Sequence, residues 1–232
     1  MSKINSCIYL LCRFPMLNPD EVPRFESFDK PHSSLLYSSL LLNHKEIFDS
    51  IPGLANICYC IDHKDRDFIP AEFQNVDSVI WIDTSLKNEA FRVLIDKYFS
   101  KFNNNIIVTA DSIGMTGEDF KKILNLLSID DNAVVLGKTF NNKLCSIGFN
   151  VLDRSFFTEF NFEDLNYNKA LTPVCKQDVH LHTLNSFLVI ETLDEFKKLY
   201  QELSKKESLA YCSHIMHEKF TALFIEYKGL LK

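Results

Sequence analysis

The chain has 232 residues, of which 46% are hydrophobic and 20 are phenylalanine, and its formal net charge is −6. Such a chain is long and apolar enough to bury a sizeable core. The acidic balance excludes a general nucleic-acid binder, because phosphate binding requires a basic surface. No segment approaches the ~20 consecutive apolar residues that cross a bilayer.

The N-terminal apolar run is too short for the core of a signal peptide. The seven cysteines are an odd number, and their spacing does not suggest a disulfide framework. These features predict reduced thiols and a cytoplasmic protein. No linker, repeat or low-complexity stretch interrupts the sequence, so we expect one domain over residues 1–232.

Strand-like and helix-like patterns alternate in the first part of the chain. Short apolar runs predict strands over residues 7–12, 55–61, 78–82 and 105–110. Amphipathic patterns predict helices over residues 33–50, 86–102 and 116–127, and the inward residues of the first include Leu35, Leu36, Leu40 and Ile47. Buried strands that alternate with amphipathic helices predict a three-layer α/β/α sandwich around a mostly parallel sheet.

The pattern changes in the C-terminal part. Two strands, 133–137 and 143–150, flank an Asn-Asn turn and predict an antiparallel hairpin. A short helix over 153–160, a polar loop over 161–184 and a last strand over 187–190 are expected to follow. A capping box at residues 192–195 predicts a helix whose inward residues are Phe196, Leu199, Tyr200 and Leu203. A final helix over 209–227 is expected to bury Ile215, Phe220, Leu223 and Phe224.

The segment over residues 106–116 is the most informative. Its strand ends in Asp111, which precedes a glycine turn and a helix-capping threonine. Ligands of open α/β sheets bind outside the carboxyl ends of the strands. This predicts that the Asp111 carboxylate faces a cleft, open to solvent, where it can hold a divalent metal or a sugar hydroxyl. The alternative is a turn cap, in which Asp111 accepts from the amide of Ile113 or Gly114.

Four segments, in this order, carry a resemblance to a known family. They are Leu11-Cys-Arg13-Phe-Pro15, the segment 108–116, the pair 134–137 and 147–149, and the segment 189–195. They are similar to a Phe-Ala-Arg-x-Pro opening, a strand and Gly-Ser-Asp turn, a glycine-bounded hairpin and an Asp-x-Asp-Thr-x-Glu-Asp closing segment. The chain thus resembles small bacterial glycosyltransferase-like and nucleotidyltransferase-like proteins of the nucleotide-diphospho-sugar transferase (GT-A) superfamily.

The resemblance implies a GT-A, Rossmann-like fold with a nucleotide-binding half at residues 1–130 and an acceptor-side half at 131–232. It implies that Asp111 is the catalytic carboxylate, where Mg2+ or Mn2+ meets the diphosphate of a nucleotide sugar. It also implies that Arg13, Arg24, Lys30 and Ser112 bind the ligand, and that the 161–184 loop closes over the acceptor. From the residues alone, a surface ion pair is the favoured role for Arg13, and contact with a phosphate or carboxylate of the ligand is the alternative.

The loop after the first strand departs from the family pattern. Residues 16–30 contain no glycine, two prolines and several acids, whereas a phosphate cradle needs backbone N–H groups and fixed cations. Two hypotheses therefore remain. The chain is either a transferase acting on a nucleotide sugar or related phosphate ester, or a catalytically inactive binding or assembly module with this fold.

Other polar clusters have simpler interpretations. His180-Leu-His182, with Asp178 and Cys175 nearby, is a set that zinc accepts, and the resemblance also places it on the acceptor side. The charged run over residues 62–67 is interpreted mainly as a solvated loop, with metal or ribose binding as the alternative. The pairs Cys58/Cys60 and His214/His217 are interpreted as core thiols and solvated helix residues.

Overall fold

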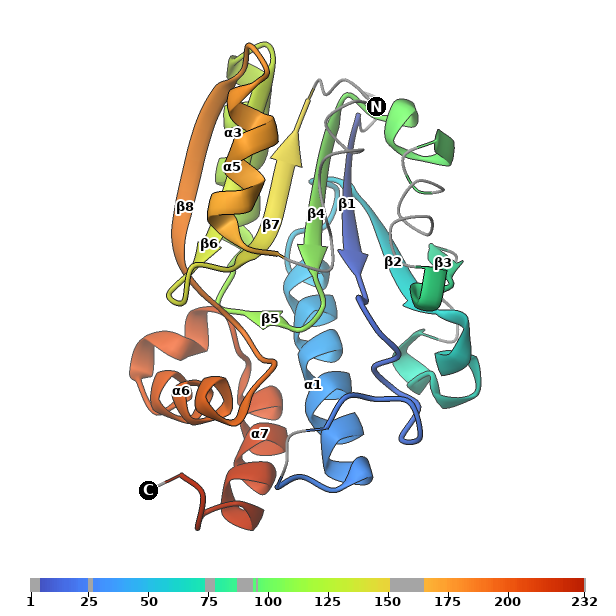
Figure 1. Ribbon diagram of the computed structural model, residues 1–232, viewed down its shortest axis with the longest axis vertical. Helices are drawn as coiled ribbons and strands as arrows, with labels where there is room; N and C mark the ends of the chain where they lie inside the picture. The colour runs from blue at the N-terminus through green and yellow to red at the C-terminus, as the bar shows by residue number, and fades with distance from the viewer. Residues whose placement is uncertain are drawn as a thin grey trace.

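The computed structural model describes residues 5–24, 27–73, 78–86, 94, 96–150 and 165–231. Eight strands of this part form one sheet in the order β3-β2-β1-β4-β7-β6-β8-β5 (Figure 1). The strands are β1 (Ser6–Leu11), β2 (Asn56–Asp62), β3 (Val79–Ile82), β4 (Asn104–Thr109), β5 (Ser112–Ile113), β6 (Ala133–Thr139), β7 (Leu144–Phe149) and β8 (His180–Val189).

The first four strands in sheet order are parallel, and β7 runs antiparallel to both β4 and β6. This arrangement confirms a mostly parallel sheet with an antiparallel hairpin. Asn142 has a φ of 64° at the hairpin turn, a left-handed conformation that asparagine tolerates. Because β4 pairs with β7, the sheet continues from the first half of the chain into the second.

Helices cover both faces of the sheet. They are α1 (Lys30–Asp49), α3 (Gly117–Ile129), α5 (Tyr167–Cys175), α6 (Leu193–Leu203) and α7 (His214–Glu226). Alternate β1 side chains point to opposite faces. Ile8 and Leu10 join the core under α1, α3, α6 and α7, whereas Cys7 and Tyr9 join the core under α5, Leu94 and residues 98–102. The three-layer α/β/α sandwich is therefore confirmed.

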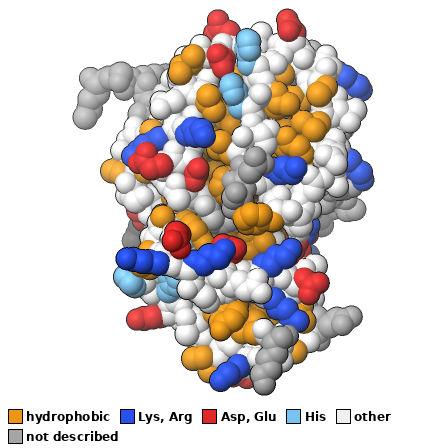
Figure 2. All heavy atoms as spheres, turned by 90° about the vertical axis from the view of Figure 1, so that its left-hand side faces the viewer, with side chains coloured by type: hydrophobic (Ala, Val, Ile, Leu, Met, Phe, Trp, Pro, Cys, Tyr) orange, Lys and Arg blue, Asp and Glu red, His pale blue; other side chains and the backbone are white. Residues whose placement is uncertain are grey.

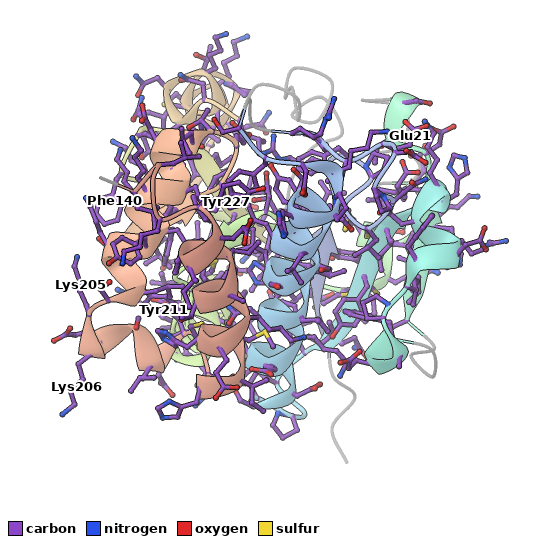
Figure 3. All side chains as sticks on the ribbon, turned by 90° about the horizontal axis from the view of Figure 1, so that it is seen from below. Glu21, Phe140, Lys205, Lys206, Tyr211 and Tyr227 are labelled. Atoms are coloured by element: carbon purple, nitrogen blue, oxygen red, sulfur yellow. The ribbon has the colours of Figure 1, made fainter. Side chains whose placement is uncertain are left out.

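The first helix begins three residues earlier than expected. The Asp29 side chain caps α1 by accepting from the His32 amide at 2.8 Å, and Pro31 suits the first turn because it has no N–H to leave unpaired. Leu35 is 39% exposed and not inward as predicted. At the same end of α1, the Tyr227 hydroxyl lies 2.8 Å from His32 Nδ1, so the chain end is held against α1 (Figure 3).

The prediction of a polar loop over residues 161–184 is wrong for the part that the structure describes. Tyr167, Ala170 and Val174 are buried at helical spacing and form the inner face of α5. Residues 180–184 form the first half of β8, paired with β6. Backbone pairing defines this first half of the strand, because among residues 180–184 only Leu184 is buried and the sequence shows no apolar pattern. The helix expected over 153–160 lies outside the described residues.

Two further expectations need correction. The final helix is interrupted: a short 3-10 turn (Lys206–Ala210) precedes α7, which begins after the Ser213 cap. Tyr200 and Ile215 are 41% and 62% exposed, and Met216 is buried in place of Ile215. Of the helix expected over 86–102, residues 87–93 and 95 lie outside the described part, while Leu94 and Phe99 are buried. No described helix has both the length and the hydrophobicity of a membrane span.

Candidate functional site

Asp111 and Arg13 meet at the carboxyl ends of two neighbouring parallel strands. Leu11 of β1 pairs in register with Thr109 of β4, and each charged residue lies two positions further along its chain. Arg13 donates through its Nε (3.5 Å) and a terminal nitrogen to the two Asp111 oxygens. Asp111 is only 1% exposed, so the expectation that it stands open to solvent is wrong. It is covered by its own counter-ion.

Glu191 completes a second carboxylate contact to the same guanidinium. The β5–β8 pairing brings the end of β8 beside Asp111, and the Ile190 amide donates to the Asp111 carbonyl oxygen at 3.0 Å. Glu191 then accepts from the same terminal nitrogen of Arg13 that binds Asp111. Two carboxylates from distant parts of the chain therefore converge on one cation.

Lys143, from the β6–β7 hairpin turn, extends this arrangement. Its ammonium donates to Glu191 and, at 2.7 Å, to Glu195. Arg13, Asp111, Lys143, Glu191 and Glu195 are called the strand-end cluster below. It holds two cations and three carboxylates, and hence one net negative formal charge.

Glu195 has a structural task in this cluster. Its second oxygen accepts from the backbone amides of Glu191 (2.7 Å) and Thr192 (3.1 Å), and the Thr192 hydroxyl accepts from its amide. The capping box predicted for α6 is thereby confirmed. Glu195 is 3% exposed. Through these hydrogen bonds it fixes the start of α6, and through its other oxygen it holds Lys143.

The charges of the cluster stabilise one another. Burial disfavours the charged form of Arg13, but Asp111 and Glu191 outweigh burial and raise the pKa of the guanidinium. Burial likewise opposes ionisation of Glu191, yet Arg13 and Lys143 lower the pKa of its carboxyl group. Arg13 and Glu191 therefore keep their charges at neutral pH.

One side of the cluster reaches solvent. The side chains of Glu191, Lys143 and Arg13 are 32%, 25% and 11% exposed, against 1% for Asp111. A band of basic and acidic side chains also crosses the middle of the face seen in Figure 2, at the level where the sheet meets the C-terminal helices. Glu191 and Lys143 are therefore accessible from solvent, whereas Asp111 is not.

The loop after β1 is organised around another buried acid. Asp65 accepts from the backbone amides of Met16 (2.8 Å), Leu17 (3.0 Å) and Asn18 (2.8 Å). Burial raises the pKa of Asp65, and these three N–H groups oppose the rise. Asp65 is 0% exposed, so the interpretation of residues 62–67 as a solvated loop is wrong for this residue.

The two other cations expected at the nucleotide, Arg24 and Lys30, have other surroundings in the described part of the chain. Lys30 pairs with Asp20 at 2.6 Å, and Arg24 is exposed. Neither forms a described ion pair with Asp111 or Glu191. Lys30 instead neutralises one of the loop acids.

Asp62, His63 and Asp83 form a second candidate metal group at the carboxyl ends of β2 and β3. Their ligand atoms all lie within 4.8 Å of one another. The Asp62 carboxylate is 0% exposed and accepts from the amides of Lys64 and Thr84, both at 2.8 Å. It therefore already serves as a cap for the following turns, and only His63 and Asp83 have side chains that reach solvent.

Ser112 is buried and its hydroxyl is already hydrogen-bonded. It is 0% exposed, and its hydroxyl donates to the Thr109 carbonyl oxygen at 2.7 Å. Its own carbonyl oxygen accepts from His44 Nε2 at 2.8 Å. Burial lowers the pKa of His44 to about 4, so this histidine is neutral and structural. The Ser112 hydroxyl, which was expected to bind the ligand, is therefore buried and already donates to Thr109.

In the described part of the chain, the expected histidine pair does not gather the cysteine and aspartate predicted beside it. His182 Nε2 lies 2.8 Å from Asp130, and His180 is exposed at the neighbouring same-face position of β8. Among the described residues, Cys175 and Asp178 do not form a three-ligand group with them. Their metal-binding role stays a prediction.

Three residues of these sites were missed from the sequence. Glu191 lies in the closing segment 189–195, where it aligns with an acid of the family pattern. That alignment is the signal that could have identified it as a site residue. Asp65 was visible only as part of a charged run. Lys143 had no signal, because only the hairpin register brings it to the cluster.

No known family model and no curated protein sequence matches the chain. Among solved structures, a proposed nucleotide-diphospho-sugar transferase from Desulfovibrio desulfuricans G20 is similar over 99% of this chain and 97% of its own, with a TM-score of 0.74 and 16% identity. A cytidylyltransferase from Leptospira borgpetersenii is similar over 99% and 97%, with a TM-score of 0.55 and 10% identity. The manganese complex of Rv0371c from Mycobacterium tuberculosis H37Rv is similar over 87% and 100%, with a TM-score of 0.52 and 9% identity. At such identities the likeness shows the fold, and the chain has the nucleotide-diphospho-sugar transferase fold.

Proposed function

We propose that this protein binds a nucleotide sugar or a related phosphate ester, with a divalent cation, at the strand-end cluster, and that it acts as a glycosyl or nucleotidyl transferase. The convergence of Asp111 and Glu191 on a single cation carries the proposal. Two such carboxylates suit Mg2+ or Mn2+, which take their remaining ligands from phosphate and water. A bound cation would stabilise the negative charge that develops on the leaving phosphate.

The charge balance of the cluster gives its residues separate tasks. Asp111 and Glu191 would hold the cation, and a divalent ion would change the net charge of the cluster from −1 to +1. Arg13, released from both carboxylates, and Lys143 would then bind phosphate oxygens. Because the cluster alone is negative, we expect the cation to be required for binding of the phosphate ester.

The second candidate is a catalytically inactive module with the same fold. It is favoured by the closed state of the cluster, in which Arg13 already neutralises the buried Asp111. It is also favoured by Asp65, which occupies the loop amides that a phosphate would use. Such a protein would bind a partner through other surfaces and would ignore nucleotide sugars.

Calorimetry and thermal unfolding with a panel of nucleotide sugars and nucleoside triphosphates, each with and without Mn2+ or Mg2+, separate the two. A ligand at about 100 times its Kd stabilises the native state by roughly 2.7 kcal/mol, a readily measured shift. We expect cation-dependent binding that Asp111→Asn abolishes and that Asp131→Asn, a change at an exposed acid, leaves intact. If Asp83→Asn abolishes it instead, the cation lies at the second metal group. No response to any member of the panel would support the inactive module.

A further inference from the structure

The loop after β1 turns three consecutive backbone N–H groups toward one point. Met16 donates to one oxygen of Asp65, and Leu17 and Asn18 donate to the other. Met16 is 0% and Leu17 3% exposed, so water does not compete for their two amides, whereas Asn18 is half-buried. Successive amides that converge on one anion form the kind of concave site in which proteins bind phosphate.

Other contacts hold the shape of this loop. The Leu17 carbonyl oxygen accepts from the Ser34 hydroxyl of α1 at 2.7 Å, and the Asn18 side chain donates to the Lys64 carbonyl oxygen at 3.3 Å. Lys64 also pairs with Glu21 further along the loop at 3.1 Å, on the side of the molecule where Figure 3 labels Glu21. The amides of residues 16–18 therefore have a scaffold apart from Asp65.

We propose that the amides of residues 16–18 form an anion-binding site, that the Asp65 carboxylate occupies it as a built-in ligand, and that Asp65 thereby excludes a phosphate group from this loop. The vacated site would take an inorganic phosphate or a phosphate ester. A phosphate cannot share the site with Asp65, because two anions would compete for the same three donors. One consequence rests on the proposed function: phosphate groups of the ligand then bind Arg13 and Lys143 and not this loop.

The test is an Asp65→Ala variant titrated with inorganic phosphate, with no nucleotide sugar or metal present. The change leaves the buried amides of Met16 and Leu17 and the half-buried amide of Asn18 without an acceptor. We therefore expect a lower melting temperature that phosphate raises saturably and chloride of equal ionic strength does not. The direct readout is the amide resonances of Met16, Leu17 and Asn18, which should shift with phosphate in the variant only. The matched control is Asp67→Ala, which removes an exposed acid from the same short 3-10 helix (His63–Phe68).

Two results with folded proteins would overturn the proposal, and a third applies if the variants do not fold. One is a folded Asp65→Ala protein whose three amides ignore phosphate. The other is a wild-type protein whose same amides shift with phosphate, since Asp65 would then exclude nothing. If Asp65→Ala does not fold alone, recovery of its fold by phosphate supports the site, and failure of both Asp65→Ala and Asp65→Ser to fold at any phosphate concentration contradicts it. Because only inorganic phosphate is used, the outcome does not depend on the proposed transferase activity.

Discussion

Arg13 and Asp111 illustrate how unequal the two members of a buried ion pair can be. Arg13 has a second carboxylate partner, Glu191, whereas Arg13 is the described side-chain partner of the buried Asp111. Removing Asp111 leaves a paired cation, but removing Arg13 leaves a carboxylate stranded at 1% exposure. A stranded buried charge is the costlier defect.

We therefore expect Arg13→Met to reduce the free energy of unfolding by about 3–5 kcal/mol, and Asp111→Asn to reduce it by less. The double variant should be more stable than the sum of the two single changes predicts, because it removes the stranded charge. Urea unfolding of the four proteins measures these values. Lys121→Met, which removes a surface ion pair with Glu118, is the control and should change little. Equal losses for the two single variants would show that Asp111 has another source of stabilisation.

Protonation of His44 is unfavourable in the folded protein. Its Nε2 donates to Ser112, while its buried Nδ1 has no hydrogen-bond partner in the described structure. Protonation would place a second donor at Nδ1 with nothing to accept it. The pKa of His44 in the folded protein, lowered by burial to about 4 from 6.5, expresses this cost.

Since the folded-state pKa lies below the unfolded one, the stability from neutral His44 is complete above about pH 6.5 and is lost as the pH falls toward 4. Between pH 7 and 5 the loss from this group amounts to about 2 kcal/mol. His44→Gln keeps a donor for Ser112 but cannot titrate, so its stability should decline less over this range. Thermal or urea unfolding at both pH values gives the comparison, with exposed His214→Gln as the control. Parallel declines of wild type and His44→Gln would contradict the assignment.

At the level of elements, the approach of α3 to the sheet depends on one glycine. A Cβ at Gly148 of β7 would lie 2.6 Å from Ile123 Cγ2 and 3.4 Å from Leu127 Cδ1, both on α3. The first distance is far inside van der Waals contact. Any side chain at position 148 must push α3 outward or distort β7.

Gly148→Ala should therefore destabilise the protein by about 1–3 kcal/mol through overpacking. Adding Ile123→Ala removes the methyl group that clashes, so the double variant should lose less than the sum of its parts. Denaturant unfolding provides both numbers. Gly229→Ala is the matched control, because a Cβ there meets nothing within 4 Å. A neutral Gly148→Ala would mean that α3 lies further from β7 than described.

The elements that could be predicted are those whose signals are local. The Thr192 box and the Thr116 cap both appear where their spacing indicates, with N3 acids that reach back to the cap amide. The first half of β8 could not be predicted, because it is defined by pairing with β6 and not by its own side chains. The predicted last helix is interrupted at Ser213, whose hydroxyl accepts from the Met216 amide and caps α7. This N-cap lies inside an apolar pattern that predicted a continuous helix.

The candidate site was predictable to the same extent. The strand-end position of Arg13 and Asp111 follows from two short apolar runs and the rule for parallel sheets. Their mutual burial did not follow, because one sequence does not state which opposite charges meet. Lys143 and Asp65 act across 48 and 47 residues of chain, on Glu191 and Asn18. Contacts over such separations come from topology, which no local pattern encodes.

At the scale of the whole molecule, the two halves of the chain share their cores. The β4–β7 pairing joins them within one sheet, and the core that contains Ile8 and Leu36 also contains Phe196 and Phe220. Neither residues 1–130 nor residues 131–232 can lose their structure without exposing apolar surface on the other. This interdependence is the condition for a single cooperative transition.

We accordingly expect one unfolding midpoint from probes in every part of the chain. Trp81 in β3 is the single tryptophan and reports the far edge of the sheet by fluorescence. Pulse labelling of the buried thiols Cys12, Cys145 and Cys212, resolved by peptide mass spectrometry, reports β1, β7 and the approach to α7 during the same urea titration. Coincident midpoints follow if the shared sheet couples the halves. A lower midpoint at Cys212 alone would show that the C-terminal helices unfold as a separate unit, and the strand-end cluster, which α6 anchors through Glu195, would then open without global unfolding.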